Sequence, residues 1–191
     1  MGELFNFSFV ELVMNKFSLP MAKLNFESDY GFISICANAD GITHLNFIPQ
    51  TDDEWLSREI DSQVLQQNKL NTATEQQQAH THLLQAKQQL LEYFDGKRQY
   101  FDVALAPKGT EFQQQVWQAL TEIDFGQSCS YGDIANKVNR PKAVRAVGTA
   151  NGANPIAILV PCHRVIGKNG TLTGYAYGLA LKQKLLKLEG L

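Results

Sequence analysis

Cys162 and His163 are neighbours in the chain, and their residue types are the best suited to nucleophilic chemistry. A free thiol has a pKa of about 8.5, so a base or a positive environment must supply thiolate before the sulfur can attack at neutral pH. Adjacent side chains on an extended segment point in opposite directions, and a bridging water is therefore expected to relay the proton to His163. The competing interpretation is an inert core thiol beside a hydrogen-bonded histidine.

The apolar run at residues 156–160 precedes Cys162 and His163 and must position them, and it is expected to form one buried strand or extended segment. Pro161 ends the run, because it fixes its own φ and disfavours helix at the residue before it. A closing helix is predicted from about Leu179 to Leu188. Its leucines lie near one face, its lysines, including Lys182, lie elsewhere, and Glu189 follows at its end.

Two short capped helices before the pair predict a helix-turn-helix. Ser130 is a good N-cap for a helix over residues 131–138, and Pro141 suits the first turn of a second helix that ends near Gly152. An earlier helix is predicted to begin at Thr110. Three cations lie on or just before the second helix: Arg140, Lys142 and Arg145. Their charge favours contact with phosphate.

The first half of the chain has a different pattern, in which strand-like runs precede one long helix. The alternating runs at residues 32–36 and 42–47 flank a turn that ends in Asp-Gly at Gly41, which predicts a β-hairpin. A helix is predicted within residues 63–91, behind a capping box that starts at Thr72, and it should pack on the sheet.

The chain changes character near residues 107–109, the predicted domain boundary. Residues 101–105 alternate like a last strand before it. Residues 1–107 carry 7 basic and 14 acidic side chains, net −7, whereas residues 108–191 carry 10 basic and 5 acidic side chains, net +5. This asymmetry favours contact of the second half with an anion such as DNA phosphate.

Composition is that of a globular protein. The 191 residues suffice for one large domain or two small ones, and no apolar run approaches a membrane span. The first 20 residues lack the positive start of a secretory signal. The three cysteines have neither disulfide nor zinc spacing, which fits a reducing cytoplasm. His80 and His82, two apart in a polar stretch, predict no metal site.

Seven short segments, taken in chain order, carry a resemblance to a known family. They read FQQQVW at 112–117, SYGDIA at 130–135, RAVG at 145–148, NP at 154–155, PCHRV at 161–165, GY at 174–175 and LEG at 188–190. Together they resemble the O6-alkylguanine-DNA alkyltransferases, suicide repair proteins that take an alkyl group from guanine onto their own cysteine. The resemblance covers about residues 95–191 closely and 21–94 loosely.

The resemblance implies an α+β protein of two domains. Residues 21–106 would form a small N-terminal α/β domain of ribonuclease H-like fold. Residues 107–191 would form a mostly helical, winged-helix-like domain with a helix-turn-helix and the acceptor cysteine. Residues 1–20 would be an N-terminal extension or would precede a true start at Met21. Some relatives bind zinc in the N-terminal domain, but this half has one cysteine and no convincing ligand set, so we expect no metal. The chemistry requires no cofactor, and we expect a cytoplasmic monomer that acts once, because a thioether is not hydrolysed.

The resemblance also implies roles for single residues. Cys162 would be the nucleophile, His163 its base through a water, and Glu189 the carboxylate that orients the imidazole. Tyr131 would contact the flipped guanine and give its ring nitrogen a hydrogen bond or proton, while the backbone at Ala176 contacts O6. The other pocket or structural residues are Asn154 as a hinge, Tyr175 as a wall, Val165 and Lys182.

Double-stranded DNA containing O6-alkylguanine is the implied partner, bound through its minor groove. Arg145 would enter the base stack and fill the gap that the flipped nucleotide leaves. The remaining DNA contacts would come from Arg140, Lys142, Ala146 and Gly148. Activity on O4-alkylthymine stays open.

Tyr177 stands where relatives commonly carry a small residue, which puts the acceptance of large alkyl groups in doubt. Cys129, next to the DNA-side helix, has no assigned function. Two other functions stay open. A hydrolase built on cysteine, histidine and glutamate would turn over and need an oxyanion hole. A non-catalytic protein that recognises alkyl damage would lack the acceptor cysteine, and Cys162 is present.

Overall fold

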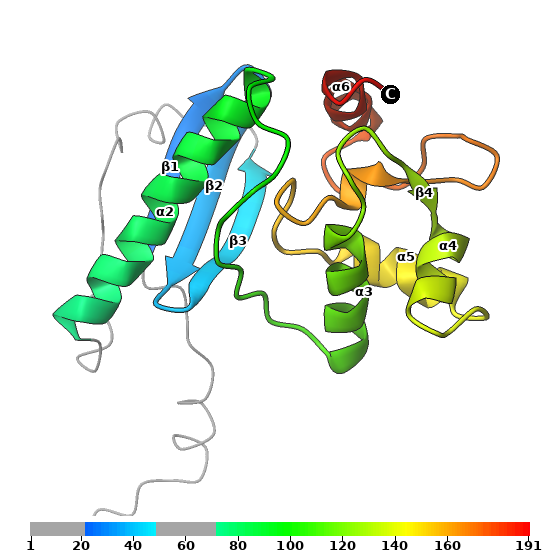
Figure 1. Cartoon of the computed structure of the whole chain (residues 1–191), viewed down its shortest axis with the longest axis horizontal. Coiled ribbons are helices and arrows are strands. Elements are labelled where there is room, and N and C mark those ends of the chain that lie inside the picture. The colour runs from blue at the N-terminus through cyan, green and yellow to red at the C-terminus, as the bar shows by residue number, and fades with distance from the viewer. Residues whose placement is uncertain (1–21, 49–71) are drawn as a thin grey trace, which may run out of the picture.

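The computed structural model describes residues 22–48 and 72–191, so the predicted N-terminal extension at 1–20 lies outside the described residues. The described chain forms a three-stranded sheet covered by one long helix, with a group of shorter helices beside it (Figure 1). This is the mixed α+β architecture that the sequence predicts. In the described ranges, no helix has the length and apolar character needed to cross a membrane.

The sheet consists of β1 (Ala22–Ser28), β2 (Gly31–Asn38) and β3 (Gly41–Ile48), which pair as antiparallel neighbours in that order. The predicted hairpin is confirmed, because Asn38 pairs with Gly41 across the β2–β3 turn. A Cβ at Gly41 would collide with the carbonyl of Ala104, so glycine is needed where the segment that contains Ala104 passes close to the hairpin turn.

Helix α2 (Ala73–Phe94) begins at the predicted capping box, in which Thr72 and Glu75 bind each other's backbone through their side chains. Residues 63–71, the start of the predicted helix, lie outside the described part of the chain. The inner side of α2 packs on the sheet and buries residues such as Leu90 in the core.

Residues 101–105 do not form the predicted strand, because side chains of α2 supply the hydrogen-bond partners of the Asp102 backbone and the sheet bonds this described stretch only around Leu105. The Gln89 side chain accepts from the Asp102 backbone N–H at 2.8 Å and donates to the Asp102 carbonyl at 3.1 Å. In this stretch of the described chain, Leu105 pairs with the sheet through one isolated bridge to Ile42. Alternating hydrophobicity does not distinguish such a segment from a strand.

The second half contains α3 (Glu111–Thr121), β4 (Cys129–Ser130), α4 (Tyr131–Lys137), α5 (Val144–Gly152) and β5 (Val165–Ile166). The predicted caps at Thr110 and Ser130 are confirmed, each as a capping box. Helix α5 begins later than predicted, because Pro141 lies inside a turn that the Ala143 N–H closes. β4 and β5 form a short parallel pair. The winged-helix likeness of this half stays a prediction.

Residues 156–160 are buried as predicted, but the prediction of a strand or extended segment is wrong, because the backbone turns at residues 157–159. Ile156 forms an isolated bridge to Leu45 of β3, and the backbone then turns, with Ile158 at a φ of 67°. That left-handed conformation is strained for a β-branched residue. The turn leads into a short 3-10 helix, η1 (Cys162–Arg164). An apolar run of this length does not distinguish a strand from a buried turn.

Helix α6 (Leu179–Leu188) has the predicted bounds, and Glu189 is its C-cap. The predicted placement of Lys182 away from the buried face is wrong, because Lys182 is fully buried. Its ammonium donates to the carbonyls of Val165 at 2.6 Å and Thr173 at 2.7 Å, which compensates the loss of water.

Candidate functional site

Cys162 lies at the start of η1 with 5% of its surface exposed. Burial raises the pKa of its thiol, and the Asn154 side chain and the charge of Lys182 offset part of that rise. The sulfur is therefore protonated at neutral pH until a base accepts its proton.

His163 is fully buried, and its hydrogen bond determines which ring nitrogen can act as a base. Nε2 lies 3.0 Å from Glu189 Oε1. Burial alone would raise the pKa of Glu189, but hydrogen bonds from His163 and Arg164 outweigh it and lower the pKa to about 2. A charged carboxylate accepts only, so Nε2 carries the proton and Nδ1 keeps its lone pair. Nδ1 is buried and has no hydrogen-bond partner among the described residues.

The Glu189 carboxylate is held by side chains from two parts of the fold, η1 and α2. Arg164 donates to Oε2 through Nε at 2.8 Å and to Oε1 through Nη2 at 2.9 Å. Its Nη1 also donates to the carbonyl of Ile123 at 2.6 Å. The hydroxyl of Tyr93, on α2, donates to Oε1 at 2.7 Å. The buried charge is thus both paired and hydrogen-bonded, as a buried ion requires.

Arg164 and Tyr93 are contacts that sequence reasoning missed. The position of Arg164 in the PCHRV segment was a usable signal, since an arginine in a buried stretch needs an acid partner. Tyr93 has no such signal, because it lies 96 positions before Glu189.

Asn154 ties the turn before the cysteine into one conformation. Its amide donates to the carbonyls of Ile156 at 3.3 Å and Val160 at 2.9 Å, and its Oδ1 accepts from the Ile156 N–H at 3.1 Å. The neighbouring Asn151 donates to the carbonyl of Cys162 at a marginal 3.5 Å. Asn154 therefore lies where a hinge was predicted, although its bonds stay within the arm itself.

Two tyrosines from the loop before α6 lie near the thiol. Tyr175 and Tyr177 lie close enough to Cys162 that its charge, after burial, contributes to raising the pKa of both phenols, that of Tyr177 to about 12. The Tyr177 ring packs edge-on against Tyr175 at 5.4 Å and Phe47 at 5.3 Å, and its hydroxyl donates to Asn46 at 2.8 Å. Ala176, between the two tyrosines, is exposed.

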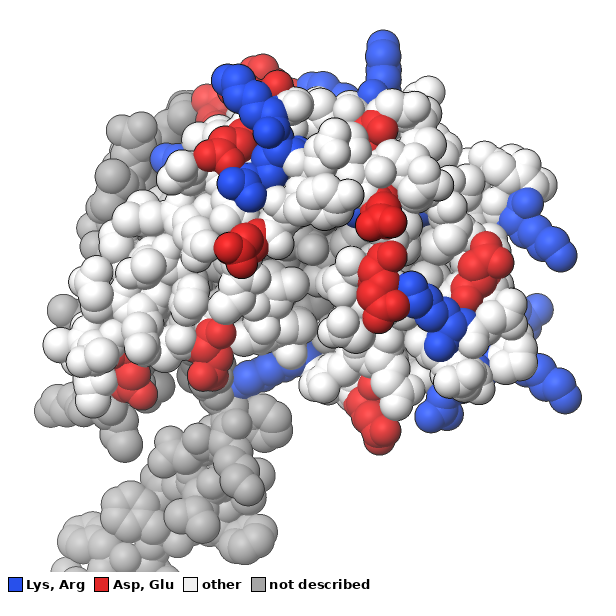
Figure 2. All heavy atoms as spheres, in the orientation of Figure 1, with Lys and Arg blue, Asp and Glu red and all other residues white. Residues whose placement is uncertain are grey.

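The residues predicted to meet DNA lie on α4, α5 and the turn between them. Tyr131 opens α4, with its hydroxyl donating to the Thr173 carbonyl at 3.3 Å and its ring beside Gly148. Arg145 is exposed on α5. The other exposed members of this face are Arg140, Lys142 and Ala146. Lysine and arginine side chains project at the side of the molecule formed by α4 and α5 (Figure 2).

The described residues contain no group of three or more His, Cys, Asp or Glu placed to hold a metal ion. His82, from the polar stretch of α2, contacts the carbonyl of Ala39 at 3.2 Å instead. Cys129 is half-buried, and burial raises the pKa of its thiol to about 11. Very little of this thiol is therefore ionised to the reactive thiolate at neutral pH.

Acidification is expected to destabilise the fold through His163. Burial lowers its pKa, and Glu189 opposes this only in part. The unfolded chain then binds a proton that the folded protein does not. Stability that is present above the unfolded pKa of about 6.5 is therefore lost as pH falls below it, by up to about 1.4 kcal/mol per pH unit.

Urea unfolding followed by circular dichroism from about pH 7.5 to pH 5 measures this slope. The variant His163→Gln should show a flatter profile, with the part due to His44, whose pKa burial also lowers, remaining. Equal slopes for the two proteins would contradict the assignment. Glu189 adds nothing in this range, because its contribution is lost only below about pH 4.3.

Known proteins match both halves of the chain. Residues 22–107 match the ribonuclease-like domain of 6-O-methylguanine DNA methyltransferase, and residues 111–191 match its DNA binding domain. The methylated-DNA–protein-cysteine methyltransferase of Methanosarcina acetivorans is 45% identical over 170 residues, 86% of this chain and 96% of that protein. The constitutive enzyme of that name from Bacillus subtilis is 49% identical over 164 residues, 85% and 92% of the two chains.

Solved structures of methyltransferases are also similar to this chain. The O6-methylguanine methyltransferase of Mycobacterium tuberculosis has a TM-score of 0.69 and 39% identity, over 87% of this chain and 91% of that one. The OGT of the same organism in complex with DNA has a TM-score of 0.70 and 40% identity over the same shares. The chain belongs to the 6-O-methylguanine DNA methyltransferase family.

Proposed function

We propose that this protein repairs DNA by moving the alkyl group of O6-alkylguanine onto Cys162, once per molecule and irreversibly. The observation that carries the proposal is a buried thiol next to a histidine whose Nε2 is committed to the Glu189 carboxylate and whose Nδ1 can accept a proton. The names of its relatives, which specify methylated DNA and protein cysteine, support the same reaction type.

The reaction is one displacement at carbon. His163 Nδ1 accepts the proton of Cys162 through a bridging water, and Glu189 stabilises the resulting imidazolium. The sulfur forms a bond to the alkyl carbon as the bond from that carbon to guanine O6 breaks. The electron pair of the broken bond stays on guanine, whose ring nitrogen takes a proton from Tyr131, and solvent reprotonates the phenol. The thioether product has no route back to thiol.

DNA is the partner of this family, and we place it against α4 and α5 from the minor-groove side. Exposed cations and the match to a DNA binding domain support this placement. Arg145 would fill the gap after nucleotide flipping, with Arg140 and Lys142 on phosphates and the small Ala146 and Gly148 allowing close approach. We expect a monomer, and the free thiols of the described residues fit the cytoplasm.

The test is an intact-protein mass after incubation with a short duplex that carries one O6-methylguanine, followed by peptide mapping. We expect a stoichiometric gain of one methyl group on Cys162, none with an unmodified duplex, and none in Cys162→Ala. Cys129→Ala is the matched control and should react like the wild type. Tight binding without a mass change would indicate a damage-recognition protein, and no binding would favour a hydrolase.

Tyr177 is expected to limit the size of the alkyl group. Replacing it with alanine removes the ring beside Tyr175 and Phe47, so the rate with O6-benzylguanine relative to O6-methylguanine should rise at least about tenfold. Tyr177→Phe keeps the ring and should keep the wild-type ratio. Competition between two labelled duplexes measures the ratio, and an unchanged ratio in the alanine variant would show that Tyr177 does not wall the pocket.

A further inference from the structure

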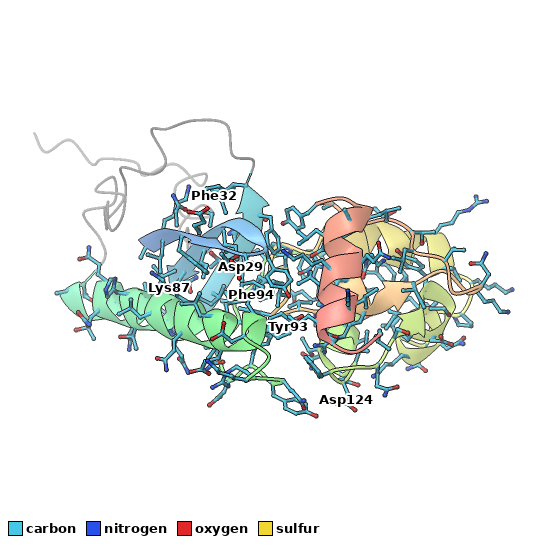
Figure 3. The ribbon with its side chains drawn as sticks, turned by 90° about the horizontal axis from the view of Figure 1, so that it is seen from above. Asp29, Phe32, Lys87, Tyr93, Phe94 and Asp124 are labelled. Atoms are coloured by element: carbon cyan, nitrogen blue, oxygen red, sulfur yellow. The ribbon has the colours of Figure 1, made fainter. Side chains whose placement is uncertain are left out.

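Tyr93 links the N-terminal half to the buried carboxylate of the site. It is fully buried and lies at the end of α2 that faces the second half of the molecule (Figure 3). Its ring packs against the aromatic rings of Phe94, Phe101 and Phe125. A phenylalanine at position 93 would make the same ring contacts. What distinguishes tyrosine here is the hydroxyl that donates to Glu189 Oε1 at 2.7 Å.

The same carboxylate oxygen receives Nε2 of His163 at 3.0 Å. Tyr93 and His163 therefore share the negative charge of one oxygen, to which Arg164 Nη2 also donates at 2.9 Å, whereas Oε2 accepts from Arg164 Nε. A donor on Oε1 disperses that charge and weakens the attraction between the carboxylate and a protonated imidazole. The basicity of His163 thus depends on a residue of the other half of the chain.

The direction of the Tyr93 hydrogen bond does not change. Burial, and then the charge of Glu189, raise the pKa of the Tyr93 phenol, so it stays protonated over the working range. A phenol hydroxyl facing a carboxylate can only donate. The contact is therefore a constant influence on Glu189.

We infer that Tyr93 is a positioning residue for the proposed alkyl transfer, which fixes Glu189 Oε1 and moderates its charge so that His163 stays neutral and Nδ1 remains available to the thiol of Cys162. The inference rests on the proposed function. Without the hydroxyl, Glu189 would stabilise the protonated imidazole more strongly, and His163 would stop accepting the thiol proton at a higher pH.

The charged groups around His163 come from several elements, and together with the Tyr93 hydroxyl they determine how readily its imidazole is protonated. They are Arg164 on η1, Lys182 on α6, Glu189 at the end of α6 and, through Glu189, Tyr93 on α2. The two cations oppose protonation of His163 and Glu189 favours it. Removing the Tyr93 hydroxyl leaves all the other groups in place.

The experiment compares Tyr93→Phe with wild type in the full chain, using single-turnover transfer from an O6-methylguanine duplex at a series of pH values. The pH at which the rate falls to half should rise by about half a unit, which makes transfer about threefold slower on the acid side. Tyr30→Phe is the matched control, because Tyr30 stacks on Phe94 at 4.5 Å at the same end of α2. It should leave the profile unchanged.

A second variant pair shows whether the effect passes through Glu189. In a Glu189→Gln background, Tyr93→Phe should not move the profile further, because the charge it moderates is gone. An unchanged midpoint in Tyr93→Phe, or lower stability and a lower rate at every pH without a midpoint shift, would overturn the inference. If wild type transfers no methyl group, the proposed function fails, and the NMR titration of the His163 imidazole in Tyr93→Phe still tests the contact: a higher midpoint supports it and an equal one rejects it.

Discussion

Replacing Glu189 with glutamine is expected to slow transfer to Cys162 by about a hundredfold and to lower the free energy of unfolding by about 3 kcal/mol. The amide keeps the size of the side chain but removes the charge that would stabilise the His163 imidazolium. It also leaves the buried guanidinium of Arg164 without its anion, and breaking a buried ion pair from one side is strongly destabilising.

Single-turnover kinetics and urea unfolding of the same preparations measure the two effects. The matched control is Glu122→Gln, because Glu122 pairs with Lys137 at 2.8 Å on the surface. Its loss should change the unfolding free energy by less than about 1 kcal/mol and leave transfer unchanged. A Glu189→Gln protein as stable and as fast as that control would mean that the carboxylate neither stabilises the site nor orients His163.

The local parts of this fold could be predicted from the sequence because the signals are local. Thr72, Thr110 and Ser130 each bind the backbone three residues ahead, so a cap and its helix start can be read from a few letters. The β2–β3 hairpin follows from Asp-Gly between two alternating runs in the same way. The start of α5 was misplaced, because Pro141 suits a turn as well as a first helical residue.

The site itself depends on contacts that no local pattern contains. The segment before Cys162 is buried as expected, but side-chain bonds from Asn154 replace the strand pairing that its apolar letters suggest. Lys182 is buried because the carbonyls of Val165 on β5 and of Thr173 accept hydrogen bonds from its ammonium. The hydrogen bonds to Glu189 include one from Tyr93 in the other half of the chain. A contact between residues 96 positions apart leaves no signal in the residue spacing or the hydrophobic periodicity of the sequence.

Asn154 is the residue on which the position of Cys162 depends, and Asn154→Ala is expected to reduce the unfolding free energy by about 3 kcal/mol. The substitution removes three hydrogen bonds at once and leaves the buried N–H of Ile156 without its acceptor. It also removes the side-chain bonds on either side of Ile158, which then has only the backbone bond from Val160 N–H to the Ile156 carbonyl to hold its φ of 67°, a conformation that is costly by about 1–3 kcal/mol. The turn should relax, and Cys162 should move away from His163.

We therefore expect transfer in Asn154→Ala to fall about a hundredfold, since misplacement of a reacting group by about 1 Å has this effect. Asn154→Asp separates the two parts of the role, because it keeps the acceptor for Ile156 N–H but turns a charged oxygen toward the carbonyl of Val160, and it should be at least as slow. Asn151→Ala is the neighbouring control, whose single bond of 3.5 Å predicts a loss near 1 kcal/mol and nearly normal transfer. If Asn151→Ala and Asn154→Ala lose equal activity and stability, the network of Asn154 is not what places the thiol, and the burial of the apolar turn alone would have to do so.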